Sequence, residues 1–320
     1  MSKISYEGRV VIVTGAGGGL GREYALEIAR RGGAVVVNDN GADCRGIGSG
    51  SEMADGVAAE ITSAGGKAVA NHEDVGHRDA AQRIADSALS QYGRIDALIN
   101  NAGNLRNDWF ENVSIEDRDS MMSAHLKGNF NVAQAVWPHM KRAKYGRIVF
   151  VASAVGAFGN EMQSAYGVAK GGIIGLMNVL AQEGRPHNIT CNALLPNAET
   201  RMVASMDFAE MAPIIPHTQK MGVSVSPPFV APMAVYLASE LCTTTHELYS
   251  VMGGRMARAF VGVTEGWLGP RDAPPSVEDV AAHIEQIRDV REFHIPSSLK
   301  DEFRIVAEQI VAEQIVRTGS

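Results

Sequence analysis

Short apolar runs rich in valine and isoleucine alternate with longer, helix-like segments along the chain up to residue 254. The runs are the expected strands, 9–13, 34–38, 67–70, 96–99, 147–151, 189–193 and 246–251. The segments between them are the expected helices, near 19–31, 52–64, 78–92, 115–142, 164–184 and 227–238. The runs are continuously apolar rather than alternating, which is typical of strands buried on both faces. We therefore predict an α/β fold, a Rossmann-type doubly wound parallel sheet covered by helices.

The alternation stops beyond residue 254, so we expect a first domain over 1–255 and a helical C-terminal extension over 256–320. In the extension, Ser276 followed by Asp279 three residues later predicts the capped start of a helix. The sequence Val-Ala-Glu-Gln-Ile occurs twice, at 306–310 and 311–315. A five-residue copy is too short for a solenoid repeat, so we interpret this region as a terminal helix.

The composition suits a folded protein, because 45% of the 320 residues are hydrophobic and 20% are charged. The net charge of −7 and the lack of a dense Lys/Arg run argue against a nucleic-acid partner. No apolar stretch approaches the roughly 20 residues that a transmembrane helix needs, so we expect no membrane association. Three widely spaced cysteines show no metal-binding spacing and favour a reducing compartment. With no room for a signal peptide and no Ser-Lys-Leu ending, we expect a cytoplasmic protein without a metal.

A glycine-rich turn follows the first expected strand and opens the first expected helix. Residues 14–21 are Thr-Gly-Ala-Gly-Gly-Gly-Leu-Gly, with Gly15, Gly19 and Gly21 at the fixed positions and Leu20 between the last two. Glycines there allow a sharp turn, the close approach of a pyrophosphate and tight helix packing. The helix N-terminus also favours phosphate groups. The turn therefore predicts a dinucleotide-binding site.

Polar residues after the next three strands complete this predicted cofactor site. Asp39 ends the second strand, where an acidic side chain usually binds the ribose hydroxyls of NAD and repels the 2′-phosphate of NADP. We therefore predict NAD, while Arg22 and Arg45 keep NADP open as the alternative. Asp74 and Val75 follow the third strand, where the adenine ring is expected. After the fourth strand come the residues that we expect beside the second ribose or bracing the sheet, Asn101, Ala102 and Gly103.

A serine, a tyrosine and a lysine form the predicted reacting group. Tyr166 and Lys170 share a helix face because they are four residues apart. A neighbouring Lys⁺ and a cationic nicotinamide favour the phenolate, so Tyr166 is predicted to have a lowered pKa and to exchange a proton with the substrate. Ser153 follows the fifth strand, at the sheet edge where such folds bind ligands, and its hydroxyl would bind the substrate oxygen.

These motifs together resemble those of the classical short-chain dehydrogenase/reductases. A closer resemblance is to the (3R)-hydroxyacyl-CoA dehydrogenase region of the peroxisomal multifunctional enzymes of type 2, also called 17β-hydroxysteroid dehydrogenases of type 4. Its segments are GREYAL (21–26), VVVND (35–39), KAVAN (67–71), GRID (93–96), NNAG (100–103), KYGRIV (144–149), NALLPNAETRM (192–202) and EGWLG (265–269). The resemblance implies NAD-dependent oxidation of a 3-hydroxyacyl-CoA, a steroid hydroxyl or a steroid side-chain CoA thioester. It also implies a homodimer or homotetramer.

The resemblance leaves three points open. His125 stands where many classical members have an asparagine of the proton relay, and it either orders a water or is a buried, satisfied histidine. In the segment 197–226, four methionines either adapt to a bulky ligand or pack the loop, and these are Met202, Met206, Met211 and Met221. The alternative functions are an NADP-dependent 3-oxoacyl reductase of lipid synthesis and a dinucleotide-binding protein without turnover.

Overall fold

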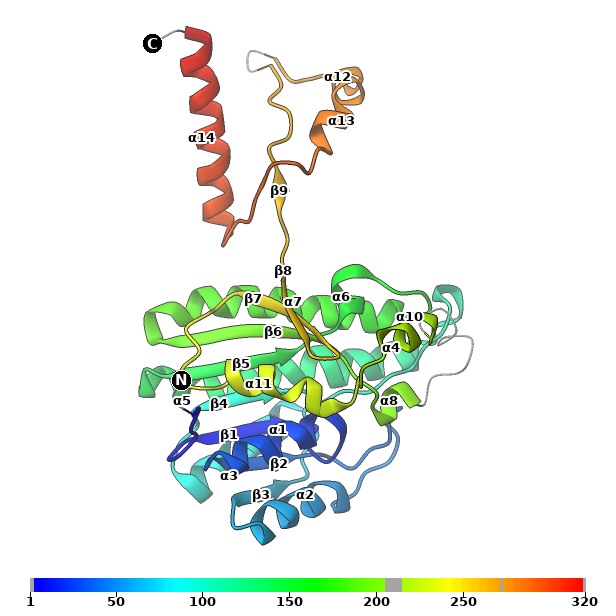
Figure 1. Ribbon diagram of the computed structural model, residues 1–320, viewed down its shortest axis with the longest axis vertical. Coiled ribbons are helices and arrows are strands. Elements are labelled where there is room, and N and C mark those ends of the chain that lie inside the picture. Colours follow the sequence, from blue (N-terminus) through cyan, green and yellow to red (C-terminus); the bar gives the residue numbers. More distant parts are fainter. Residues whose placement is uncertain (1–2, 205–214, 271–272, 319–320) are drawn as a thin grey trace. The chain divides into compact units, whose positions relative to one another are not determined.

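The apolar runs form the strands of one eight-stranded sheet in the computed structural model, which describes residues 3–204, 215–270 and 273–318 (Figure 1). The strand order is β3-β2-β1-β4-β5-β6-β7-β8, and every pair from β3 to β7 is parallel. The order reverses between β1 and β4, so the sheet is doubly wound and the predicted fold is confirmed. The strands are β1 (Val10–Thr14), β2 (Ala34–Asn38), β3 (Lys67–Asn71), β4 (Ala97–Asn100), β5 (Gly146–Val151), β6 (Ile189–Asn197), β7 (Glu247–Met252) and β8 (Arg255–Ala259).

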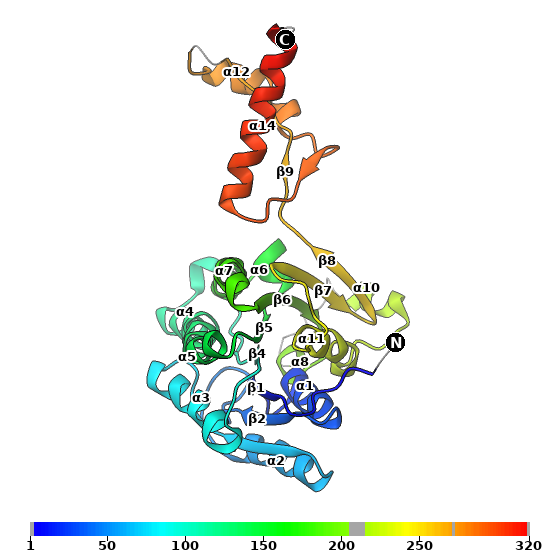
Figure 2. The same ribbon diagram turned by 90° about the vertical axis from the view of Figure 1, so that its left-hand side faces the viewer.

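Helices cover both faces of the sheet, as the continuous apolar strands require (Figure 2). One face carries α1 (Gly19–Arg30), α2 (Glu52–Ser63) and α11 (Ala231–Leu237), whose buried residues share a core with β1 and β2. The other face carries α3 (Arg78–Tyr92), α5 (Gly128–Ala143) and α7 (Ser164–Gly184). The remaining helical turns of this region are η1 (Phe110–Asn112), α4 (Ile115–Met121), η2 (Met122–Lys127), α6 (Ala154–Phe158), η3 (Arg185–His187), α8 (Arg201–Ala204), α10 (Ile215–Met221) and η4 (Pro227–Phe229).

The sequence predictions differ from the structure at several places, and three of them have a clear physical reason. The helix expected over 115–142 is interrupted by the π-helical turn η2, which apolar spacing does not reveal. The helix expected over 227–238 begins as the 3₁₀ turn η4, because two prolines stand at its start. Strand β8 was not predicted, because this edge strand is largely exposed and lacks a continuous apolar run.

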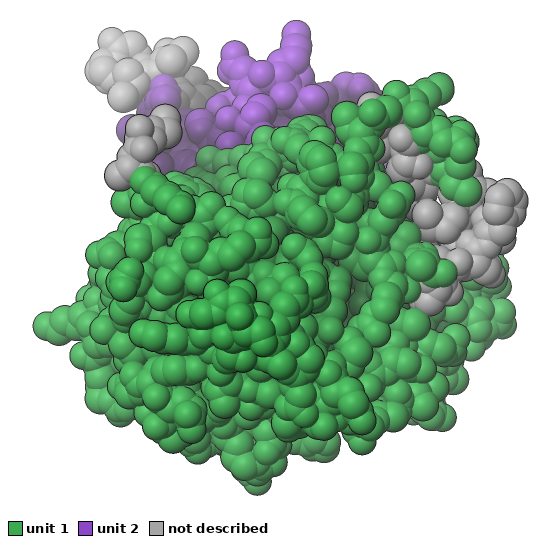
Figure 3. All heavy atoms as spheres, turned by 60° about the horizontal axis from the view of Figure 1, so that its bottom comes forward, with its two compact units in different colours: residues 1–258 green, residues 259–320 purple. Residues whose placement is uncertain are grey.

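Contacts divide the chain into the units Met1–Arg258 and Ala259–Ser320, coloured separately in Figure 3. The second unit contains α12 (Val277–Ala282), α13 (Ile284–Ile287) and α14 (Leu299–Thr318), with the antiparallel pair β9 (Val263–Thr264) and β10 (Phe293–His294). The predicted cap of α12 is confirmed, since Ser276 and Asp279 form a capping box. Both copies of the five-residue repeat lie in α14. No helix among those described combines the length and apolar character needed to cross a bilayer.

Candidate active site

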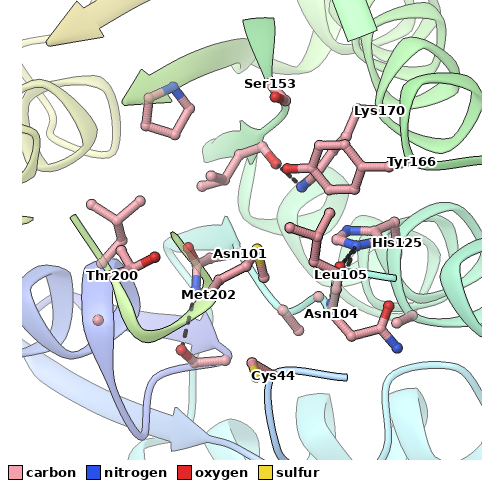
Figure 4. A pocket seen from close by; sticks show the side chains of 18 of the residues that line it. Cys44, Asn101, Asn104, Leu105, His125, Ser153, Tyr166, Lys170, Thr200 and Met202 are labelled. Atoms are coloured by element: carbon pink, nitrogen blue, oxygen red, sulfur yellow. Dashed lines mark hydrogen bonds between the residues drawn. The ribbon is translucent and has the colours of Figure 1, made fainter. Parts of the chain in front are cut away.

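A cavity of about 740 Å³ opens in the first unit, where the parallel strands end (Figure 4). Residues that follow β1 to β6 line it, as expected for a doubly wound sheet. The structure brings together here nearly all the predicted site residues, namely Gly15, Gly19, Leu20, Asp39, Asp74, Val75, Asn101, Ala102, Gly103, His125, Ser153, Tyr166 and Lys170. Gly21 is not among the lining residues.

The glycine turn fits close to its neighbours and leaves room for a ligand above it. Gly15 has a φ of +62°, and a Cβ atom there would lie 2.8 Å from the Ala102 Cα. A Cβ atom on Gly21 would lie 2.1 Å from the Gly15 carbonyl oxygen, so Gly21 is needed for packing beneath the cavity. The first N–H groups of α1 have no intrahelical acceptors and lie at the cavity. This arrangement fits the diphosphate of a dinucleotide.

Thr14 and Asn101 join the turns that follow β1 and β4. The Asn101 side-chain amide donates to the Thr14 carbonyl at 3.0 Å and to the Gly15 carbonyl at 3.1 Å. The Thr14 hydroxyl accepts from the backbone N–H groups of Asn101 at 2.9 Å and Ala102 at 3.0 Å. The bracing role considered for Asn101 is therefore present, and its contact with a ribose stays a prediction.

Asp39 is held by backbone amides at the edge of the cavity. Its Oδ2 accepts from the Gly17 N–H and its Oδ1 from the Gly41 N–H, each at 2.9 Å. These bonds fix the carboxylate beside the glycine turn, where a ribose hydroxyl would meet it. Of the two arginines that left NADP open, Arg22 pairs with Glu23 and Glu60, and neither Arg22 nor Arg45 is among the lining residues.

The residues after β3 are also fixed by hydrogen bonds. Asp74 accepts from the Gly76 N–H at 2.8 Å. The Val75 side chain is buried, and its carbonyl accepts from the Asn131 side chain at 3.1 Å. Val75 thus presents an apolar surface at the end of the cavity where we predicted the adenine ring.

Ser153, Tyr166 and Lys170 lie together at another part of the cavity (Figure 4). Ser153 caps the N-terminus of α6, and its hydroxyl accepts from the Val155 N–H at 3.1 Å. Lys170 Nζ donates to the Val151 carbonyl at 2.6 Å and lies 5.6 Å from the centre of the Tyr166 ring. The α7 spacing and the end of β5 therefore place a hydroxyl, a phenol and an amine around one space.

Burial controls the charges of this group. Desolvation raises the pKa of Tyr166, and a hydrogen bond with Ser153 opposes that rise. Desolvation also lowers the pKa of Lys170 to about 7. In the chain alone the pKa of Tyr166 is therefore raised, because the loss of water outweighs the hydrogen bond with Ser153. The lowered pKa that we predicted beside Lys⁺ and a cationic nicotinamide stays a prediction for the complex with cofactor.

His125 lies on the π-helical turn η2 and contacts Tyr166. The two rings meet edge to face, with centroids 5.2 Å apart. His125 Nε2 lies 2.6 Å from the Asn104 carbonyl oxygen and 3.2 Å from the Asn104 backbone nitrogen. A carbonyl can only accept and its contact is the shorter, so we assign the ring proton to Nε2 as donor. Nδ1 is buried and has no hydrogen-bond partner among the described residues. Burial lowers the pKa of His125 well below its ordinary value, so the ring is neutral with a free acceptor. Only one of the two ring nitrogens therefore has a hydrogen-bond partner among the described residues.

Several lining residues were missed by the sequence analysis. Asn104 follows the Asn-Asn-Ala-Gly segment directly and is buried in the cavity wall, so its position after a parallel strand was the available signal. Thr200 and Arg201 come from the segment after β6 and contact the glycine turn. Cys44, from the loop after β2, accepts from the Leu105 N–H through its carbonyl at 2.9 Å. No local sequence pattern predicts these long-range contacts.

Of the four methionines considered for ligand binding, Met202 lines the cavity. Met206 and Met211 lie outside the described residues, as does the side chain of Met221. In the part of the chain that the structure describes, no three His, Cys, Asp or Glu side chains are grouped to hold a metal ion.

Comparisons with known proteins agree with this geometry. The family described as short chain dehydrogenase matches residues 9–210. A short-chain type dehydrogenase/reductase of Mycobacterium tuberculosis is 44% identical over 282 residues, which cover 88% of this chain and 94% of that protein. The peroxisomal multifunctional enzyme type 2 of Mus musculus is 42% identical over 301 residues, 94% of this chain but only 39% of that longer enzyme. The resemblance inferred from the motifs is confirmed.

A solved structure is similar in fold and was determined with ligands. A 7α-hydroxysteroid dehydrogenase in complex with NADH and 7-oxo glycochenodeoxycholic acid has a TM-score of 0.70 and 26% sequence identity. The match covers 78% of this chain and 95% of that structure.

The burial of Lys170 makes a prediction about stability. Because its pKa is lowered from 10.5 to about 7, the unfolded chain binds a proton more readily than the folded chain. The resulting destabilisation is complete below about pH 7 and disappears as the pH rises toward 10.5. We expect the Lys170→Met variant to have a higher melting temperature than the wild type. This difference should be largest at pH 6 and should decrease toward pH 10.

Differential scanning fluorimetry at pH 6, 8 and 10 measures this trend. The control is Lys67→Met, which removes the same charge from an exposed strand position. If the difference in melting temperature between Lys170→Met and the wild type were the same at all three pH values, the lowered pKa of Lys170 would be contradicted.

Proposed function

The chain belongs to the short-chain dehydrogenase/reductase family, and from this premise we propose that it oxidises the secondary alcohol of a 3-hydroxyacyl-CoA or a steroid with NAD. As a member of that family it is an oxidoreductase that acts on CH–OH groups. The observation that carries the proposal is a single cavity that contains both the glycine turn and the group Ser153, Tyr166 and Lys170. Neither part alone would indicate this reaction.

The cavity offers a binding position for each part of a dinucleotide. We assign the diphosphate to the turn of Gly15, Gly19 and Leu20, beneath which Gly21 packs. The adenosine end is assigned to Asp39 for the ribose and to Asp74 and Val75 for the base. The nicotinamide end is assigned to Asn101, Ala102, Gly103, Tyr166 and Lys170.

The bound nicotinamide supplies the hydride acceptor and a positive charge. Ser153 and Tyr166 bind the substrate hydroxyl, and Tyr166 takes its proton as hydride leaves the carbon. In the chain alone the pKa of Tyr166 is raised, so proton transfer near neutral pH needs a cation beside the phenol. Lys170 contributes by holding the ribose and by lying 5.6 Å from the Tyr166 ring centre.

His125 is proposed as a positioning residue for this proton transfer. His125 lines the cavity next to Tyr166, its buried Nδ1 has no hydrogen-bond partner among the described residues, and burial favours its neutral form. A water bound to Nδ1 would satisfy that atom and connect it to the reacting group. This supports the water-ordering alternative over that of a satisfied core histidine.

NAD is proposed over NADP because of Asp39. The carboxylate is fixed by two backbone N–H groups at the place assigned to the adenosine ribose, so a 2′-phosphate would meet a negative charge. Arg22, the cation closest in sequence to the turn, is already neutralised by Glu23 and Glu60.

The substrate class rests on the cavity wall and on the relatives. Apolar side chains contribute to the cavity wall, among them Leu105, Val155, Phe158, Met202 and Met252. They suit the carbon skeleton of an acyl chain or a steroid. Relatives include a peroxisomal multifunctional enzyme type 2, and a steroid was bound to the similar hydroxysteroid dehydrogenase.

We also propose that the protein is a homodimer or homotetramer. On α7, Val168, Gly175 and Val179 share one exposed face by their helical spacing. Gly175 has open space around it, so it can accept close contact with a second helix. Light scattering coupled to gel filtration would show a mass of one chain if this proposal is wrong.

The proposed location is the cytoplasm. All three cysteines are free thiols, which suits a reducing compartment. Cell fractionation with an antibody against the protein tests this location, and recovery in an organelle fraction would refute it.

The central experiment measures NADH formation at 340 nm with 3-hydroxyacyl-CoA substrates of increasing chain length, a hydroxysteroid and a steroid-CoA thioester. We expect turnover with at least one of these classes and a loss of about 100-fold or more in kcat for Tyr166→Phe, since general acid–base catalysis contributes that much. Tyr92→Phe, at the end of α3, is the matched control and should retain the rate.

Two results would redirect the assignment. Faster turnover with NADPH and a 3-oxoacyl thioester would favour the reductase alternative. Tight NADH binding without turnover on the whole panel would indicate a dinucleotide-binding protein.

For cofactor choice, Asp39→Asn should raise the ratio of kcat/KM for NADP to that for NAD by about tenfold, because it removes a charge next to the 2′ position. The measurement is a titration of both dinucleotides at a fixed substrate concentration. An unchanged ratio would place the adenosine ribose elsewhere.

For His125, we expect His125→Leu to lower kcat by about tenfold at unchanged KM and to alter the solvent deuterium isotope effect, because the acceptor for the ordered water is lost. His125→Asn, which keeps an acceptor, should restore part of the rate. A purely structural role would instead lower the melting temperature and leave the isotope effect as in the wild type.

A further inference from the structure

Arg201 extends from the start of α8 to the glycine turn at the start of α1. Its Nη2 lies 2.8 Å from the position that a Cβ atom on Gly18 would occupy. Its Nη1 lies 3.7 Å from the sulfur of Met53 on α2. The guanidinium therefore occupies the space above Gly18 that any larger residue there would fill, and it faces the cavity.

The charge of Arg201 has no counterion in the described structure. Among the described residues, no carboxylate lies within ion-pair distance of its guanidinium, whereas Arg22 on α1 is paired with Glu23 and Glu60. A methionine sulfur is only a weak acceptor. The donors of Arg201 are thus available to an anion at the cavity.

We infer that Arg201 binds the diphosphate of the dinucleotide, as a cationic arm supplied by the segment after β6. This inference rests on the proposed function. The turn contributes backbone N–H groups and the positive end of α1 but no charged side chain, since residues 15–20 are glycine, alanine and leucine. A guanidinium above Gly18 adds the full positive charge that these groups lack, and its planar donors suit phosphate oxygens.

The geometry favours the diphosphate over a 2′-phosphate. Gly18 is the N-cap of α1, directly beside the first free N–H groups of that helix. The 2′ position is assigned to Asp39, whose carboxylate is tied to Gly17 and Gly41 and would oppose a second anion. Arg201 is thus placed to recognise what NAD and NADP share, while Asp39 distinguishes them.

The arm also connects two parts of the site. Thr200 contacts the turn beside it, since a Cβ atom on Gly19 would lie 3.6 Å from the Thr200 Cγ2. The next residues, Met202 and Val203, line the cavity. A diphosphate bound to Arg201 would therefore hold the beginning of this segment against the turn.

The test compares the binding of adenosine, ADP, 2′,5′-ADP and NADH by the wild-type chain, Arg201→Gln, Arg201→Lys and the control Arg22→Gln, by calorimetry or by fluorescence for NADH. For Arg201→Gln we expect ADP and NADH to bind about tenfold more weakly and adenosine to bind as in the wild type, because a bond to a charged group is lost. Arg201→Lys should recover part of this loss, and Arg22→Gln should show none.

Each other outcome overturns the inference. Unchanged ADP binding by Arg201→Gln would show that the arm does not touch the diphosphate. An equal loss for adenosine would indicate a general disturbance of the site. A loss confined to 2′,5′-ADP would move Arg201 to the ribose phosphate. If the wild-type chain bound neither ADP nor NADH, the proposed function would fail instead.

Discussion

The hydrogen bonds between Thr14 and Asn101 hold the site together. The strands β1 and β4 are neighbours at the point where the strand order reverses, so their turns diverge and would leave a gap. Asn101 closes the base of that gap by donating to two carbonyls of the first turn, and the Thr14 hydroxyl accepts from the second turn. The close approach of Gly15 to Ala102 depends on this bridge. Both the expected diphosphate and nicotinamide positions are therefore set by one junction.

Burial of Tyr166 and Lys170 disfavours the charged forms that proton transfer needs. A phenol and an amine are placed side by side with little water, which favours the neutral form of each. The lowered pKa of Lys170, about 7, makes its charge easy to lose near neutral pH, while its hydrogen bond to the Val151 carbonyl and that between Tyr166 and Ser153 hold both side chains in place. A bound cation changes this balance, because it stabilises a phenolate far more in a desolvated site than it would in water. In the proposed reaction, cofactor binding would thereby favour proton transfer to Tyr166.

Most of the fold and most of the site followed from the sequence, for identifiable reasons. Buried parallel strands are apolar throughout, so β2 was predicted to its residue bounds, and β1, β3, β4, β5 and β7 to within one residue, whereas β6 extends four residues beyond its predicted end. The glycine turn could be recognised because its glycines allow a sharp turn, the close approach of a ligand and tight helix packing. The edge strand β8 lacks such a run, and the π-helical turn around His125 changes hydrogen bonding without changing the pattern of apolar residues. Arg201 was missed because its place above Gly18 depends on where β6 ends relative to α1.

The distribution of charge in the cavity explains why one cleft can serve two ligands. Beside the glycine turn lie a fixed carboxylate, Asp39, and a guanidinium, Arg201, that has no carboxylate partner among the described residues, and in the proposed complex these would hold the polar, anionic dinucleotide. The wall also contains apolar side chains, Leu105, Val155, Phe158, Met202 and Met252, which would suit a carbon skeleton. In the proposed complex, the charged groups beside the glycine turn hold the adenosine and the diphosphate, which leaves the nicotinamide to reach Tyr166.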